Sequence, residues 1–167
     1  IPALRFRAGE QTVGETMAFT NDIISNINRR EPIGIDKNGT PYRVLVVDDS
    51  TVMRKIVTQI LRSEAFEIVS EASNGEEGVE MYNEYKPHLV TMDINMPIMD
   101  GLTALKKILS IDPAARVVML TSESEQKMVL EAIQSGAKNY VVKPPDRAIL
   151  LEKVKASLEN DPGTANR

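Results

Sequence analysis

The sequence contains no cysteine, which excludes disulfide bonds, thiolate metal sites and cysteine nucleophiles. Basic residues do not outnumber acidic ones, because the net charge is −4. No basic stripe therefore indicates binding to nucleic acid or to an anionic membrane surface. The apolar runs span only a few residues, far fewer than the roughly 20 that cross a bilayer. The composition favours a soluble protein, for which the cytoplasm is the expected location.

The ordered part of the chain is expected to begin near Tyr42 and to end near Leu158. Five short runs rich in β-branched residues recur within it, and most lack polar alternation, as is typical of parallel strands covered on both faces. These expected strands are RVLVVDD (43–49), FEIVSEA (66–72), HLVTMD (88–93), RVVMLTS (116–122) and NYVVK (139–143). Apolar residues at helical spacing follow each run, and the segment that carries Val79 and Tyr82 is the weakest of these helices.

The alternation of strand and helix predicts an α/β fold with helices on both faces of an open parallel sheet. Among doubly wound sheets, the five-stranded flavodoxin-like order 2-1-3-4-5 reverses between the first and third strands, and ligands bind at such a switch point. Asp48 and Asp49 end the first strand, and Asp93 ends the third. We therefore expect three carboxylates to meet at the switch point.

A cluster of this kind needs a positive partner, because two unit charges about 4 Å apart repel by roughly 4 kcal/mol at an effective dielectric near 20. Magnesium suits an open rim of carboxylates, since it binds oxygen ligands and retains several waters. Lys143 ends the fifth strand and adds a fixed positive charge. The alternative is that Asp48 and Asp49 merely cap the helix that begins near Ser50.

Four segments occur in a characteristic order: VLVVDDS (44–50), TMDINMPIMDG (91–101), VMLTSE (118–123) and GAKNYVVKP (136–144). Over about residues 42–158 the chain resembles the receiver domain of two-component response regulators, and within that family the chemotaxis regulators of the CheY type. The resemblance implies that Asp93 accepts a phosphoryl group from a histidine kinase. It also implies a magnesium ion bound by Asp48, Asp49, Asp93 and the backbone carbonyl of Asn95. The spacing alone does not identify the nucleophile.

The resemblance assigns roles to further residues of the site. The Thr121 hydroxyl would contact the phosphoryl group, and Lys143 would neutralise its charge after a cis bond to Pro144. Asn95 and Glu123 would border the path of the hydrolytic water, so we expect a short-lived phosphoryl group. Tyr140 would be a switch residue that turns inward when the threonine moves. Pro145 departs from the pattern, since the family often has phenylalanine there.

Output is expected from a surface formed by the fourth helix, the fifth strand and the fifth helix, with no enzymatic activity beyond phosphotransfer to the protein itself and autodephosphorylation. Partners implied by the resemblance are a histidine kinase of the chemotaxis type and a flagellar motor switch protein or a phosphatase. In the fourth helix, the apolar stripe expected to face the core consists of Val129, Ala132, Ile133 and Gly136. Lys127, Met128 and Glu131 lie off this stripe and are candidate contacts.

Residues 1–41 lie outside the resemblance and form an extension that is either amphipathic or flexible. Val13, Met17, Thr20, Ile24 and Ile27 recur at helical spacing, and GIDKNGTP (34–41) is typical of a turn-rich linker. We expect residues 159–167 to form a tail and not a second domain. His88 precedes the third strand, away from the acidic cluster, and is expected at the surface.

Other classes of protein are less compatible with the sequence. A dinucleotide oxidoreductase needs GxGxxG, which is absent, and Asp48 and Asp49 would repel the phosphate of a flavodoxin-type cofactor. Phosphatases that form an aspartyl phosphate carry DxDx[TV] after the first strand, whereas here the run DIN follows the third. Two alternatives stay open: the receiver of a chemotaxis methylesterase or transcriptional regulator, and a phosphate-independent protein-binding module. Asp100, just before Gly101, is interpreted as a turn or cap residue.

Overall fold

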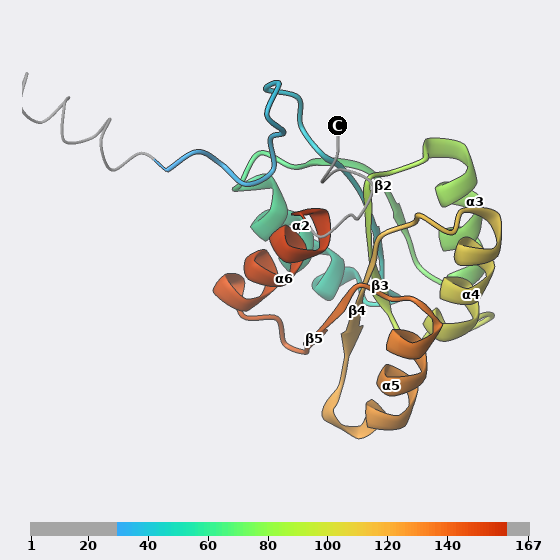
Figure 1. Ribbon diagram of the computed structural model, residues 1–167. Helices are drawn as coiled ribbons and strands as arrows, with labels where there is room; N and C mark the ends of the chain where they lie inside the picture. The colour runs from blue at the N-terminus through green and yellow to red at the C-terminus, as the bar shows by residue number, and fades with distance from the viewer. Residues whose placement is uncertain (1–29, 160–167) are drawn as a thin grey trace, which may run out of the picture. The chain divides into compact units, whose positions relative to one another are not determined.

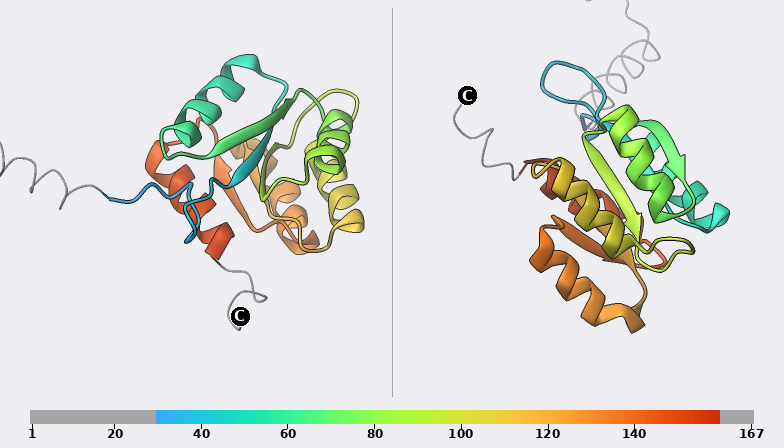
Figure 2. Two further views of the ribbon diagram at one scale, coloured as in Figure 1. Left: turned by 90° about the horizontal axis from the view of Figure 1, so that it is seen from above. Right: turned by 90° about the vertical axis from the view of Figure 1, so that its right-hand side faces the viewer.

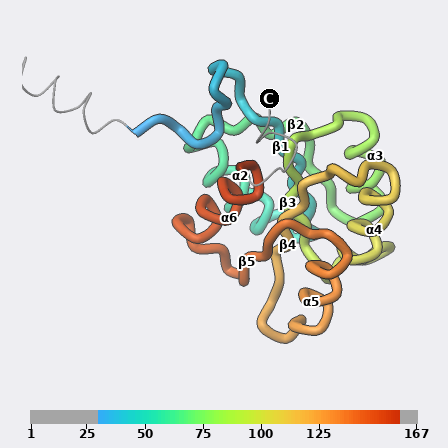
Figure 3. The backbone as a smooth tube through the Cα atoms, in the orientation of Figure 1, coloured from blue at the N-terminus to red at the C-terminus, as the bar shows by residue number. Residues whose placement is uncertain are grey.

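The computed structural model describes residues 30–159, in which five strands form one parallel sheet. The order is β2-β1-β3-β4-β5, so the predicted flavodoxin-like topology is confirmed, with β1 and β3 side by side at the reversal (Figures 1 and 3). The strands are β1 (Arg43–Val47), β2 (Glu67–Ala72), β3 (Leu89–Asp93), β4 (Val117–Thr121) and β5 (Asn139–Val142). Each lies within one of the runs that were expected to form strands.

Five α-helices cover the sheet, with α2 and α6 on one face and α3, α4 and α5 on the other (Figures 1 and 2). The helices are α2 (Thr51–Arg62), α3 (Gly75–Tyr85), α4 (Gly101–Ile111), α5 (Gln126–Ser135) and α6 (Arg147–Glu159). Ser50 is the N-cap of α2, because its hydroxyl oxygen accepts a hydrogen bond from the Met53 amide at 3.2 Å. The N-cap of α2 is therefore Ser50, and neither Asp48 nor Asp49 is the N-cap residue.

The central strands bury both of their faces, which explains why their sequences lack polar alternation. Leu45 and Val47 of β1 pack in the cluster beneath α3, α4 and α5, whereas Val44 and Val46 pack in the cluster beneath α2 and α6. The weakly marked helix α3 is formed as well, and its Tyr82 is buried in the first of these clusters. The two apolar layers hold the sheet rigidly between them.

The stripe predicted for α5 is partly wrong, because Met128 is partly buried and packs against the core, whereas Ile133, which was expected to face the core, is 39% exposed. Lys127 and Glu131 are exposed as expected, but Leu130 and Ile133 are exposed too. The helix packs on α4 and on β4, and only Val129 and Ala132 within it are buried. The face of α5 toward β5 consequently stays open, although the sequence places apolar residues on it.

The segment before β1 folds into a short turn beside the end of α2. Ile35 and Pro41 form an antiparallel bridge, and the Asp36 carboxylate accepts hydrogen bonds from two amides within the turn. The Gly34 amide donates to the Glu64 carbonyl at 2.8 Å, which attaches the turn to the end of α2. The apolar stripe expected between Val13 and Ile27, and the expected tail from residue 160 onward, lie outside the described residues.

Among residues 30–159, no helix is both long enough and apolar enough to span a membrane.

Ile98, in the loop between β3 and α4, has an unusual backbone conformation with φ of +69°. Its side chain is 77% exposed, so packing does not compensate for this conformation. The left-handed region costs an L residue roughly 1–2 kcal/mol, and a β-branched residue is a particularly rare occupant. Residue 98 is therefore a strained position that a different side chain should relieve.

We expect Ile98→Asn to raise the free energy of unfolding by about 1 kcal/mol, because asparagine tolerates the left-handed region. Urea unfolding measures this change. The matched control is Ile149→Asn, which makes the same substitution at an exposed isoleucine within α6 and should give no gain. Equal effects of the two substitutions would show that backbone strain at Ile98 is not the cause.

Candidate functional site

Three carboxylates meet where β1 and β3 end. Val47 of β1 is in register with Met92 of β3, so the residues that follow them, Asp48 and Asp93, reach the same edge of the sheet. The side chain of Asp49 joins them, and carboxylate oxygens of the three residues lie within 4.8 Å of one another. Asp48 and Asp93 are buried, whereas Asp49 is exposed. The strand order thus produces the predicted acidic cluster at the switch point.

Lys143 supplies the positive charge of the cluster from the end of β5. Its Nζ lies 2.7 Å from Asp93 Oδ1 and 2.9 Å from Asp48 Oδ2. Burial acts to lower the pKa of Lys143, but the adjacent carboxylates of Asp93 and Asp48 leave that pKa raised overall, so the ammonium stays charged. The backbone amide of Lys143 donates to the Thr121 carbonyl at 2.7 Å, and the expected cis bond to Pro144 is present.

The environment of Asp93 disfavours its charged form despite the lysine. Burial raises the pKa of Asp93 to about 6; the hydrogen bond from Lys143 lowers it, and the nearby charge of Asp48 raises it further. One ammonium therefore does not compensate the whole cluster.

The residues present fit a hard divalent cation. Asp48 Oδ1 accepts a hydrogen bond from the Ser50 amide at 2.9 Å. Asp48 Oδ2 is buried and has no hydrogen-bond partner among the described residues, although Lys143 Nζ lies 2.9 Å from it. A buried carboxylate oxygen without a hydrogen-bond partner can bind a cation, and together with two neighbouring carboxylates it forms the kind of oxygen ligand set that magnesium prefers.

The loop after Asp93 is held tightly against the end of β3. The Gly101 amide donates to the Ile94 carbonyl at 2.7 Å. A Cβ atom at residue 101 would lie 1.9 Å from the Asp93 carbonyl oxygen, so only glycine fits this approach. Asp100 caps α4 by accepting from the Thr103 amide at 2.7 Å, which confirms its interpretation as a cap residue.

Thr121 ends β4 beside the acidic cluster, but its hydroxyl is bonded elsewhere. The hydroxyl donates to Glu125 Oε2 at 2.8 Å and lies 3.0 Å from the Ser122 carbonyl. Glu125 Oε2 also accepts from the Ser122 amide at 3.0 Å, and Glu125 Oε1 accepts from the side-chain amide of Asn95. Sequence reasoning missed Glu125, although the spacing Ser-x-x-Glu over 122–125 is the signature of a capping box.

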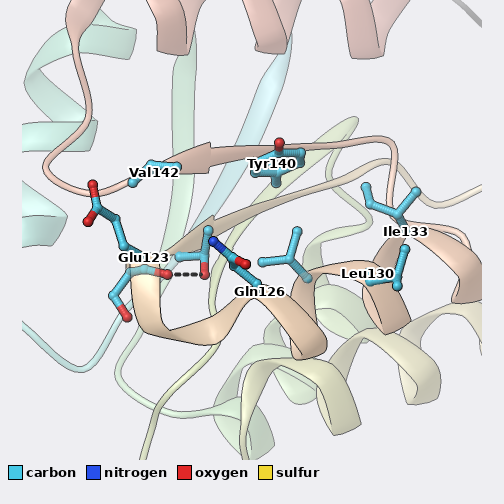
Figure 4. Close-up of a pocket in the computed structure, with 9 residues that line it drawn as sticks. Glu123, Gln126, Leu130, Ile133, Tyr140 and Val142 are labelled. Atoms are coloured by element: carbon cyan, nitrogen blue, oxygen red, sulfur yellow. Dashed lines mark hydrogen bonds between the residues drawn. The ribbon is translucent and has the colours of Figure 1, made fainter.

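The other residues singled out from the sequence lie around this centre. Asn95 and Glu123 are exposed at the rim, and His88 is exposed at the opposite end of the sheet, where its Nδ1 accepts from the Arg43 amide at 2.9 Å. Tyr140 is 44% exposed in a groove between β5 and α5, with Val142 beside it and Leu130 and Ile133 across from it (Figure 4). Pro145 is buried where the family often places an aromatic ring.

Residues 44–155 match the family described as the response regulator receiver domain. The chain belongs to this family. It is 50% identical over 135 residues to the chemotaxis protein CheY of Treponema pallidum. This alignment covers 80% of this chain and 94% of that protein. It is 49% identical to CheY of Bacillus subtilis, over 70% of this chain and 98% of that protein.

Solved structures agree with the family assignment. The receiver domain is similar to a protein in the crystal structure of the CheX–CheY–BeF3–Mg²⁺ complex from Borrelia burgdorferi, with a TM-score of 0.72 and 42% sequence identity. That match covers 75% of this chain and 96% of the other. The protein is thus a CheY-like receiver domain of the two-component signalling type.

The raised pKa of Asp93 predicts a pH dependence for the metal-free protein. Because the folded-state pKa, about 6, exceeds the ordinary value of 3.8, this group contributes stability at low pH that is lost as the pH rises past 6. Relative to Asp93→Asn, the wild type should lose about 1–2 kcal/mol of unfolding free energy between about pH 5 and about pH 8.

Urea unfolding of both proteins in a chelator, at the two pH values, measures this difference. The comparison removes the contributions of groups that the two proteins share, such as His88. Parallel pH profiles would contradict the assignment of a raised pKa to Asp93. Addition of magnesium at the higher pH should stabilise the wild type in proportion to the logarithm of its concentration.

Proposed function

We propose that this receiver domain is phosphorylated on Asp93 by a histidine kinase and signals through phosphorylation-dependent binding of a partner. The observation that carries the proposal is the convergence of Asp48, Asp49 and Asp93 at the switch point, with Lys143 2.7 Å from Asp93. A buried carboxylate flanked by a metal-ligand set and a fixed ammonium suits phosphoryl transfer, which depends on positioning and charge neutralisation.

In the proposed reaction, a carboxylate oxygen of Asp93 attacks the phosphorus of a phosphohistidine. The new O–P bond forms as the P–N bond breaks, and the imidazole leaves and takes up a proton. Asp48, Asp49, Asp93 and the Asn95 carbonyl would hold magnesium, which supplies positive charge to the phosphoryl oxygens. Lys143 stabilises the same charge, and Thr121 donates its hydroxyl to a phosphoryl oxygen.

A small phosphodonor such as acetyl phosphate should label the wild type with one phosphoryl group in the presence of magnesium. Asp93→Asn should abolish the labelling, because it removes the nucleophile while retaining the shape of the side chain. Intact-protein mass spectrometry measures the added mass. Asp146→Asn is the matched control, since it makes the same change at an exposed aspartate outside the cluster and should be labelled normally. Labelling of Asp93→Asn would show that Asp93 is not the acceptor, and no labelling of the wild type would support the phosphate-independent binding module instead.

The phosphoryl group is expected to be short-lived. Asn95 and Glu123 are exposed and line one surface pocket, and in the proposed role they border the path of the water molecule that attacks the phosphorus and releases inorganic phosphate and the free carboxylate. A phosphorylated form that persisted for hours in isolation would contradict this role for Asn95 and Glu123.

The proposed output surface is the groove between β5 and α5. Tyr140, Val142, Leu130 and Ile133 expose apolar surface there, and Thr121 also lines the groove at the end nearest the acidic cluster. A hydroxyl that moves toward a phosphoryl group would leave space that the Tyr140 ring can enter. Similarity to CheY proteins supports chemotaxis as the process, with a flagellar motor switch protein or a phosphatase as the partner.

Since the chain contains no tryptophan, Tyr140→Trp places a single fluorescent reporter in this groove. Beryllofluoride, a phosphoryl mimic, should shift its emission to shorter wavelength in the presence of magnesium, because the ring moves from a half-exposed to a buried position. The same shift should be absent when Asp93→Asn or Thr121→Ala is added. A shift that survives Thr121→Ala would exclude the threonine as the link.

The receiver of a chemotaxis methylesterase or of a transcriptional regulator has the same type of site, so the partner distinguishes these candidates. Affinity capture with the beryllofluoride-bound and free forms separates them. Selective capture of a flagellar motor protein supports the proposed function, whereas capture of a methylesterase domain or of DNA-linked proteins favours the alternatives.

A further inference from the structure

Glu125 is an unusual residue in the described part of the chain, because a carboxylate near the protein surface is buried with both of its oxygens occupied. Its residue exposure is 7%. One oxygen accepts from the Thr121 hydroxyl and the Ser122 amide, and the other accepts from the side-chain amide of Asn95. The carboxylate thereby joins the end of β4 to the loop that follows β3.

A helix cap would require only one of these contacts. The bond from the Ser122 amide at 3.0 Å satisfies the cap of the short turn η1 (Glu123–Glu125). The bonds from Thr121 and Asn95 add nothing to the cap, since both donors lie outside the turn. Hydrogen bonds to an ionised acceptor are roughly twice as strong as neutral ones, so these two contacts restrain their donors substantially.

The two restrained groups belong to residues that the proposed function places at the phosphoryl group. Thr121 has one hydroxyl proton, which it cannot donate to Glu125 and to a phosphoryl oxygen at the same time. Asn95 is likewise bound to Glu125 through its side-chain amide, and the proposed function assigns its backbone carbonyl to the metal. Glu125 and the phosphoryl group therefore compete for the Thr121 hydroxyl, and Glu125 restrains Asn95 beside them.

We propose that Glu125 is a positioning residue that holds the receiver domain in its unphosphorylated arrangement, by binding Thr121 and Asn95 until a phosphoryl group displaces it. This inference rests on the proposed phosphorylation of Asp93. The unphosphorylated state is stabilised by the Glu125 contacts, and the phosphorylated state must break them. Removing Glu125 should then strengthen binding of a phosphoryl mimic, whereas loss of a merely structural residue should weaken it.

The test measures the dissociation constant of beryllofluoride in excess magnesium for the full chain. Glu125→Ala should bind about 10-fold more tightly than the wild type, because the restraining hydrogen bonds are gone. Glu125→Gln should lie between the two, since its carbonyl oxygen still accepts from the Ser122 amide and preserves the turn. Glu152→Ala removes one exposed carboxylate from α6 and should bind within about 2-fold of the wild type. Affinity for magnesium alone should be equal in Glu125→Ala and Glu152→Ala.

A double-mutant cycle with Thr121→Val separates restraint from a simple effect of charge. If Glu125 acts through the threonine hydroxyl, Glu125→Ala should tighten binding by only about 2-fold in the Thr121→Val background, the remainder reflecting Asn95. An undiminished effect in that background would show that removal of a negative charge is the cause, and would overturn the proposal. Unchanged or weaker binding by both Glu125 variants would overturn it as well.

The proposal and the proposed function fail in different ways. A wild type that binds no beryllofluoride contradicts phosphorylation of Asp93, and this inference with it. A wild type that binds beryllofluoride through Asp93 while the Glu125 variants behave like Glu152→Ala contradicts the role of Glu125 alone.

Discussion

The structure depends on the crowding of negative charge at the junction of β1 and β3. Parallel strands that end at the same edge bring Asp48, Asp49 and Asp93 within 4.8 Å of one another, where two unit charges repel by roughly 3 kcal/mol at an effective dielectric near 20. Lys143 compensates part of this repulsion, and a metal ion would compensate more. The domain thus holds, in its resting form, a site that favours ligands able to neutralise or spread negative charge.

The rest of the fold is needed because such repulsion would otherwise push Asp93 away from the other two carboxylates. Asp93 is fixed from both sides. The register of β3 with β1 and β4 sets its backbone, and the close approach of Gly101 to its carbonyl oxygen restrains the loop that follows. The apolar layers on both faces of the sheet make this arrangement stiff. The strained conformation of Ile98 lies in the same loop, as is common beside functional sites.

Much of this arrangement could be predicted from the sequence, because strand ends and strand order are local and topological properties. The strand ends predicted that Asp48, Asp49 and Asp93 meet and that Lys143 adds a positive charge, whereas the place of Thr121 in the site came from the family resemblance. The exposed face of α5 could not be predicted, since periodicity shows that Leu130 and Ile133 are apolar but not which face the neighbouring elements leave open. The burial of Glu125 could not be predicted either. The capping-box spacing implies a hydrogen bond from the Ser122 amide, but it does not show that Thr121 and Asn95 also donate to the carboxylate.

Thr121 is bonded both to the neighbouring strand β5 and to Glu125, and this geometry limits how a change at Asp93 could reach the surface. The Thr121 carbonyl is fixed by the Lys143 amide at 2.7 Å, so β4 and β5 cannot separate there without breaking the sheet. The Thr121 side chain binds Glu125, and the proposed phosphoryl group would offer it a second partner on the side of the acidic cluster. Because that side chain also lines the groove that contains Tyr140, such a rotation would alter both the site and the exposed surface. In the proposed mechanism, the two places are linked through this one residue, and the core need not move.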